Sequence, residues 1–357
     1  MTLRVLSFVI FASAVATGLA MLPAGTAIDI TAAHSIYPSP TPPPEDDVIK
    51  IETELVNVLF SAQDRDRRLL TDIKREDIQI LEDGIVQEIA EYGQQVDLPL
   101  SLAILVDTSA SQERTLPEEK AAAKSFIDSV VRPEKDEVAI VSFTGEATLE
   151  QGMTSNVTRL ARAIDRIRFI GPSGYLGGGV VVGGNIPGTP PISGRNQTVQ
   201  GSTAIWDAIW VTSDEILGPA PERTRRAIIL LSDGVNTYGQ KKLDDAIRAA
   251  QKSEAVIYSI GIGDNFYSGV DTGALKKISE RTGGRAFFPR DEADLRRAFA
   301  QIQQEMRSQY MVSYEPTNQK RDGSYRKIEI RLINPELLKQ KISLTHREGY
   351  FAKGEKK

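Results

Sequence analysis

Residues 100–111 read LSLAILVDTSAS, and this stretch decides the fold. Its first seven residues are almost all apolar, which is typical of a strand that helices cover on both faces. Three similar runs, at 138–143, 227–231 and 256–260, alternate with segments of helical periodicity. This alternation predicts an α/β fold with a doubly wound, mostly parallel sheet.

The predicted helices of this region are spaced between the strands. They occupy 116–131, 157–167, 204–217, 243–253, 274–281 and 292–306, with a short strand at 286–288. One segment, 171–201, fits neither pattern because glycine and proline dominate it. It lacks the spacing and the lysine of a phosphate-binding loop, so we interpret it as a surface insertion.

Both ends of the chain show the alternation of β-strands. Near the N-terminus the predicted strands are 49–62 and a hairpin of 78–81 and 85–89, which turns at Asp83-Gly84. Near the C-terminus they are 310–314, 326–332 and 341–346. A hairpin alone is marginal, so we predict that 48–96 and 309–352 build one small antiparallel β domain into which 98–308 is inserted. The two linkers, near 96–99 and 306–310, should then lie close together.

The first 47 residues indicate export followed by a tether. Residues 1–27 combine Arg4, an apolar run and small residues at 24–27, the pattern of a cleaved signal peptide. The alternative is an uncleaved N-terminal membrane anchor, because the apolar run is just long enough to cross a bilayer. Residues 28–47 are proline-rich and end in three acidic residues, which favours an extended linker. Residues 353–357 form a short tail, and we expect the rest of the chain outside the cytoplasm.

Composition restricts the chemistry. The net charge of -5 and the missing basic face speak against nucleic acid as a partner. The chain has no cysteine and two histidines. His34 lies in the predicted tether and His346 in a predicted strand, so neither is assigned a role. A metal in this protein must therefore be held by oxygen atoms.

Oxygen-bearing side chains follow two of the apolar strands. Asp107, Ser109 and Ser111 come directly after 100–106, and Ser232-Asp233 follows 227–231. In open parallel sheets, ligands bind beyond the carboxyl ends of the strands. Two carboxylates with neutral hydroxyls suit Mg²⁺, which prefers about six oxygen ligands.

The residues around these positions resemble a known family. Residues 102–111, 201–209 (GSTAIWDAI) and 230–234 (LLSDG) are similar, in this order, to the three metal loops of von Willebrand factor type A domains. The resemblance implies a metal-ion-dependent adhesion site in which Ser109, Ser111 and Thr203 give hydroxyls to Mg²⁺, or to Ca²⁺ or Mn²⁺. It also implies that Asp107 and Asp233 act directly or through water. The flanking segments 77–84 and 349–351 resemble exported bacterial proteins called VWFA-related, described from acidobacteria.

Each residue also has a purely structural interpretation. Asp107 and Thr203 could cap the helices that follow them. Trp206 and Trp210 are expected to pack, and Asp207 to serve at the helix surface or as a cap.

Charge favours binding over catalysis. Two carboxylates balance a divalent cation, so an open ligand position would attract the carboxylate of a protein partner. We therefore predict an exported, metal-dependent protein-binding module that is not an enzyme. The alternatives are a metal-assisted hydrolase, for which no positioned general base is evident, and a metal-free scaffold.

Overall fold

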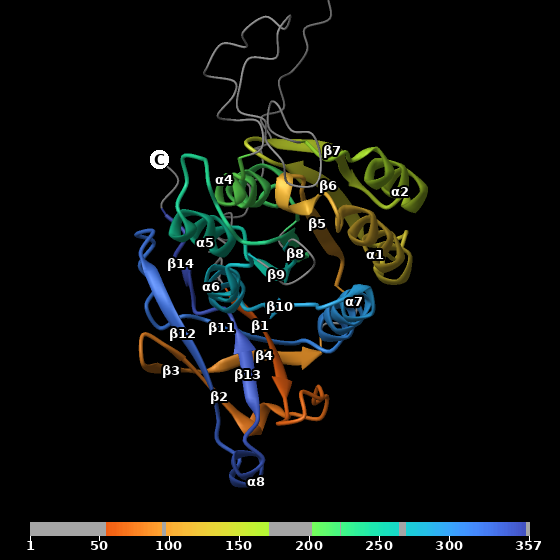
Figure 1. Cartoon of the computed structure of the whole chain (residues 1–357). Coiled ribbons are helices and arrows are strands. Elements are labelled where there is room, and N and C mark those ends of the chain that lie inside the picture. Colours follow the sequence, from red (N-terminus) through yellow and green to blue (C-terminus); the bar gives the residue numbers. More distant parts are fainter. Residues whose placement is uncertain (1–54, 95–97, 171–201, 222, 264–268, 355–357) are drawn as a thin grey trace, which may run out of the picture. The chain divides into compact units, whose positions relative to one another are not determined.

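The computed structural model describes residues 55–94, 98–170, 202–221, 223–263 and 269–354, and Figure 1 shows their arrangement. The predicted signal peptide, the proline-rich linker and the segment 171–201 lie outside the described residues. Within the described ranges, no helix has both the length and the apolar character that crossing a membrane requires.

A six-stranded sheet forms the middle of the chain, as predicted. Its order is β10-β9-β8-β5-β6-β7, and all neighbours run parallel except β6 and β7. Its strands are β5 (Leu100–Asp107), β6 (Glu137–Phe143), β7 (Ala147–Thr154), β8 (Arg225–Ser232), β9 (Ala255–Gly261) and β10 (Ala286–Phe287). Every residue of β5, β8 and β9 is buried, which explains their apolar sequences.

Helices cover both faces of this sheet, and each face has its own apolar core. The helices of one face are α1 (Leu116–Val130), α2 (Val157–Arg166) and α7 (Glu292–Arg307). The helices of the other face are α4 (Ile205–Val211), the π-helical turn η3 (Thr212–Leu217), α5 (Leu243–Lys252) and α6 (Thr272–Thr282). The predicted doubly wound α/β fold is confirmed.

Two local predictions for this region were wrong. The strand β7 was not predicted, because its side chains are half-buried or exposed and Gly152 interrupts its alternation. The helix predicted over 204–217 changes to π-helical geometry at Thr212. Hydrophobic periodicity does not distinguish these two helix types over so few residues.

Strands from both ends of the chain pair with one another (Figure 1), as the sequence predicted. The first antiparallel sheet has the order β13-β1-β11-β4, formed by Ser343–His346, Val56–Gln63, Tyr310–Tyr314 and Ile89–Gln94. The second has the order β14-β12-β2-β3, formed by Gly349–Phe351, Tyr325–Leu332, Ile78–Glu82 and Ile85–Gln87. Gln94 lies opposite Tyr310, so the chain enters and leaves the central region at neighbouring positions.

The antiparallel part differs from its prediction in detail. It contains two four-stranded sheets, and the strand predicted over 85–89 is divided at Glu88 between them. The strand β14 and the short helix α8 (Pro335–Lys339) were not predicted. The domain boundaries themselves stay predictions.

A third core lies between these two sheets and includes the stacked rings of Phe60, Tyr92 and Tyr310. A buried carboxylate, Glu82 of β2, also lies there with 2% of its surface exposed. Its Oε2 accepts hydrogen bonds from the hydroxyls of Tyr314 and Tyr350, each at 2.8 Å. Its Oε1 lies 3.3 Å from Nη1 of Arg326. This one side chain joins β2, β11, β12 and β14.

We predict that Glu82→Ala lowers the free energy of unfolding by about 3 to 5 kcal/mol, because it leaves the buried Arg326 without its counter-ion. Chemical denaturation measures the change. Glu88→Ala is the matched control, since Glu88 is exposed between β3 and β4. Equal stabilities of the two variants would contradict the structural role of Glu82.

Candidate metal site

Asp107 is the last residue of β5 and is completely buried. Its Oδ1 accepts a hydrogen bond from the backbone N–H of Ser109 at 2.9 Å. Its Oδ2 accepts one from the hydroxyl of Ser232, the last residue of β8, at 2.7 Å. Because β5 and β8 are neighbours in the sheet, this second bond joins the ends of the two central strands.

The two serines of the first loop lie side by side. Their Oγ atoms are 3.1 Å apart. Gln112, which is fully buried, donates from its side-chain amide to Ser111 Oγ at 3.1 Å and to the carbonyl oxygen of Ile262 at 2.9 Å. Gln112 therefore fixes the hydroxyl of Ser111 against the segment that follows β9.

Asp233 follows β8 and faces the same loop. Its Oδ1 accepts the backbone N–H of Val235 at 2.9 Å, and a hydrogen bond with the side chain of Ser111 lowers its pKa in part. Gly234 has a φ of 80°, and a Cβ there would lie 2.7 Å from Cγ of Leu275. Only glycine fits this turn, which directs Asp233 toward Ser111.

Thr203 lies just before α4 and is attached to the loop after Asp233. Its backbone N–H donates to Thr237 Oγ1 at 2.8 Å, and its carbonyl accepts the N–H groups of Thr237 and Tyr238 at 2.9 and 3.1 Å. These contacts place Thr203 at the carboxyl-terminal ends of the strands, near the other predicted ligands. Among the described contacts, none joins its hydroxyl directly to the other four predicted ligands.

The carboxylates of Asp107 and Asp233 repel each other when both are deprotonated. Burial raises the pKa of Asp107 to about 7, and the neighbouring charge of Asp233 adds to the shift. Burial also raises the pKa of Asp233. Two buried carboxylates next to the hydroxyls of Ser109 and Ser111 form a donor set of oxygens alone, which fits a hard divalent cation. Within the described residues, no group of three or more His, Cys, Asp or Glu comes together, so hydroxyls must supply part of any coordination here.

A third buried acid behind this site was not singled out from the sequence. Glu119, in the first turn of α1, is completely buried, and burial followed by the charge of Asp107 raises its pKa to about 8. Among the described residues, neither of its carboxylate oxygens has a hydrogen-bond partner of good geometry. The hydroxyl of Thr115, which donates to Gln112 Oε1 at 3.3 Å, lies near enough to offset part of the rise in the pKa of Glu119. Nothing in the sequence distinguishes Glu119 from the adjacent Glu118.

Trp206, Trp210 and Asp207, which the sequence predicts to be structural residues, make packing and loop contacts. Trp206 is buried in the core beneath α4, and Trp210 lies under Nζ of Lys241, which is 4.0 Å from its ring centre. Asp207 accepts the backbone N–H groups of Gln240 and Lys241 at 3.0 and 3.1 Å. It therefore supports the loop that follows Asp233.

The sheet is open and doubly wound, and carboxylate and hydroxyl oxygens lie beyond the ends of its central strands. In α/β domains of this architecture, ligands bind at that end of the sheet. Two family models of the von Willebrand factor type A domain match the chain, over residues 102–182 and 194–302. The chain therefore contains a von Willebrand factor type A domain within residues 102–302. The closer relation to the acidobacterial proteins stays a prediction.

Solved structures with a similar fold come from an animal and from bacteria. Proximal thread matrix protein 1 from the mussel byssus is 18% identical, with a TM-score of 0.46 and coverage of 63% of this chain and 51% of that one. A structure of the same mussel protein with a zinc-occupied MIDAS motif has 19% identity, a TM-score of 0.47 and coverage of 63% and 50%. This chain thus spans about half the length of the mussel protein.

An aerotolerance-related membrane protein from Bacteroides fragilis is 17% identical, with a TM-score of 0.42 and coverage of 58% of this chain and 98% of that one. A search of curated proteins gave no match.

We predict that the metal-free protein loses stability as the pH rises from about 4 to about 7. Asp107 has a pKa of 3.8 when unperturbed and about 7 in the fold, so between these values the folded state binds more protons than the unfolded state. The free energy of unfolding therefore falls with pH, by on the order of 1 kcal/mol per pH unit. Mg²⁺ should reduce the fall, because it favours the charged carboxylates.

Denaturation in EDTA at several pH values measures this slope. Asp107→Asn removes one titrating group and should make the slope less steep, although Glu119 and Asp233, whose pKa values burial also raises, keep part of it. Asp83→Asn, at an exposed turn, should leave the slope unchanged. A slope that is the same in the parent protein and in Asp107→Asn would refute the assignment.

A second prediction concerns Gln112. Gln112→Met keeps the volume but removes the hydrogen bond to Ser111, so we expect Mn²⁺ affinity to fall roughly tenfold, as for other residues that orient metal ligands. Titration calorimetry gives the affinity. Gln304→Met, at an exposed position of α7, is the control. Unchanged affinity in Gln112→Met would show that Gln112 does not position the site.

Proposed function

We propose that the chain is an exported binding module that engages a protein partner through a divalent cation. Ser109, Ser111 and Thr203 would supply hydroxyl oxygens to Mg²⁺, Ca²⁺ or Mn²⁺, with Asp107 and Asp233 directly or through water. The observation that carries the proposal is the buried pair Asp107 and Asp233, whose charged forms are unfavourable together and which face two hydroxyls.

A divalent cation would remove this penalty, because its charge balances both carboxylates. The hydroxyl ligands add no charge. The bound ion would act as a Lewis acid at the carboxyl-terminal ends of the strands and would attract an anionic oxygen. The side-chain carboxylate of a protein partner could provide that oxygen. The residues of the chain hold and orient the ion: Ser232 fixes Asp107, and Gln112 fixes Ser111.

Binding is proposed in preference to hydrolysis because neither His346 nor Glu119 can serve as a general base at the site. His346 lies in β13, where its ring contacts the backbone of Arg347 and Ile330. Glu119, whose pKa burial raises, has no exposed surface and therefore no access to a substrate. Export is proposed from the sequence of residues 1–27.

The test uses two displayed peptide libraries. One contains Asp and Glu, and the other has Asn and Gln at the same positions. We expect the full chain to select peptides from the acidic library in Mg²⁺ or Mn²⁺ and to lose them in EDTA. Ser109→Ala should lose binding, and Ser343→Ala, at an exposed strand position, should retain it. Selection that persists in EDTA would contradict the proposal.

Two further measurements separate the alternatives. Metal analysis of the purified protein tests the metal-free scaffold, which predicts no bound divalent cation. A screen of ester, phosphate and peptide substrates tests the hydrolase. Metal-dependent turnover that Ser109→Ala abolishes would replace binding with catalysis.

A further inference from the structure

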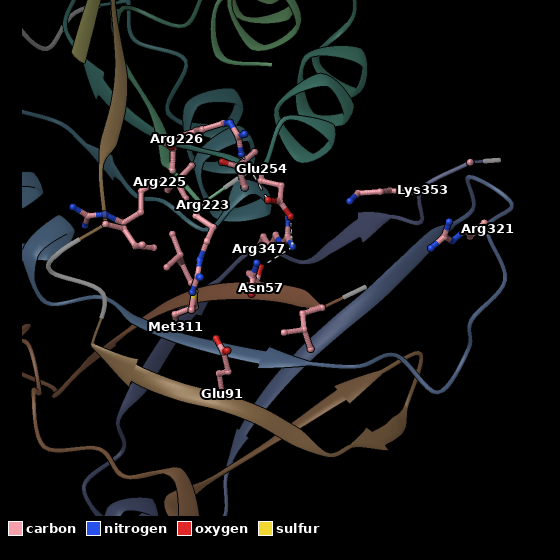
Figure 2. Close-up of a pocket in the computed structure, with 17 residues that line it drawn as sticks. Asn57, Glu91, Arg223, Arg225, Arg226, Glu254, Met311, Arg321, Arg347 and Lys353 are labelled. Carbon is pink, nitrogen blue, oxygen red and sulfur yellow. Dashed lines mark hydrogen bonds and ion pairs between the residues drawn. The ribbon is translucent and has the colours of Figure 1, made fainter. Parts of the chain in front are cut away.

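A second candidate site lies at the amino-terminal ends of the parallel strands, opposite the proposed metal site. A cavity of about 870 Å³ is lined by the start of β8 and by β1, β4 and β11 of the first antiparallel sheet (Figure 2). β8 begins at Arg225 in this cavity and ends at Ser232 beside Asp107. The length of that strand therefore separates the cavity from the proposed metal site.

Positive charge is concentrated in this cavity, although the whole chain carries a net charge of -5. Two carboxylates, Glu91 and Glu254, are among the residues that line it. The cationic side chains that line it are those of Arg223, Arg225, Arg226, Arg321, Arg347 and Lys353. The imbalance indicates an anionic ligand.

Arg347 is the central cation and is only 7% exposed. Its Nη2 donates to the carbonyl oxygen of Asn57 at 2.9 Å and to Glu254 Oε1 at 3.1 Å. Its Nε and Nη1 are buried without a hydrogen-bond partner. A buried guanidinium whose charge is only partly neutralised is costly, so an anion in the cavity beside it would be stabilised.

Glu254 does not neutralise the cavity, because two arginines share it. Besides Arg347, it lies 3.8 Å from Nη1 of Arg226. The guanidinium of Arg226 also donates to the carbonyl oxygens of Leu217 and Pro221, each at 3.1 Å. One carboxylate thus faces two positive charges on its side of the cavity (Figure 2).

Arg223 extends from the segment before β8 toward Met311 of β11 (Figure 2). No hydrogen bond or ion pair joins its side chain to another described residue. Arg225, at the start of β8, also lines the cavity: its Nη1 donates to the carbonyl oxygen of Met306 at 2.5 Å, and its Nε has no partner. Burial lowers the pKa of Arg225, and the charge of Arg132, which is not among the residues that line the cavity, adds to that shift.

We infer that this cavity binds a small multivalent oxyanion, held chiefly by Arg223 and Arg347. The volume falls in the range of small-molecule sites, roughly 300 to 1,000 Å³. The planar guanidinium fork suits phosphate and carboxylate oxygens alike. Such a ligand would bridge the parallel sheet and the first antiparallel sheet, and so would stabilise the folded chain by linkage.

The test titrates the full chain with pyrophosphate and with citrate, after divalent cations have been removed on a chelating resin, in a chelator-free buffer at constant ionic strength set with NaCl. We expect saturable binding by calorimetry and a rise in Tm. Arg223→Ala should weaken binding about tenfold or more, the loss expected for a charged hydrogen bond. Arg347→Lys should also weaken it.

Arg290→Ala is the control, because Arg290 is exposed at the start of the α7 region and outside the cavity. Arg223 is exposed as well, so its variant keeps the test valid if Arg347→Lys fails to fold. Tighter binding of pyrophosphate identifies a phosphorylated ligand, and tighter binding of citrate a polycarboxylate.

Two results would overturn the inference. One is a Tm rise that NaCl reproduces at equal ionic strength, and the other is equal affinity of Arg223→Ala and Arg290→Ala. Because the protein and buffer are free of divalent cations throughout, the outcome is independent of the proposed metal-dependent binding.

Discussion

The hydrogen bond from the hydroxyl of Ser232 to Asp107 Oδ2 is the constraint on which the site depends. It joins the ends of the two central strands, whose registers the parallel pairing already fixes from Leu100 to Val106. The loops after these strands therefore start from one rigid position. The first loop brings Ser109 and Ser111 together, and the second brings Asp233 toward them, with Gly234 as the residue that permits the turn. The site is accordingly built on strand ends, which hold side chains more rigidly than free loops do.

Much of this arrangement could be predicted from the sequence, because apolar strands buried on both faces have a strong signal. β5 and β8 were located to within two residues at each end, and the polar residues after them indicated the end of the sheet where the candidate site lies. The pairing of the two chain ends was also predictable, since too few strands lie at either end to bury a core alone. β7 and the division at Glu88 were not, because both depend on which neighbouring strand is available, and that is a property of the tertiary fold.

The supporting residues of the site were harder to find. Ser232 and Gln112 are adjacent in sequence to predicted ligands, yet only the fold shows that their side chains turn toward Asp107 and Ser111. Glu119 lies twelve residues beyond Asp107, and its complete burial follows from the packing of α1 against the sheet. The cationic cavity is more remote still, because Arg223 and Arg347 come from segments that only the folded chain brings together. Long-range juxtaposition of this kind leaves no local pattern to recognise.

The pairing of Gln94 with Tyr310 has a mechanical consequence. The connections into and out of the parallel sheet are held side by side by the ladder of β4 and β11, whose hydrogen bonds lie outside the von Willebrand factor type A region. A pulling force applied to the two ends of the described chain would load β1 and β14 first, because these strands lie next to the ends. The parallel sheet and its loops would bear no tension until the ladder of β4 and β11 opened, so a partner bound at the proposed metal site would meet an undistorted surface.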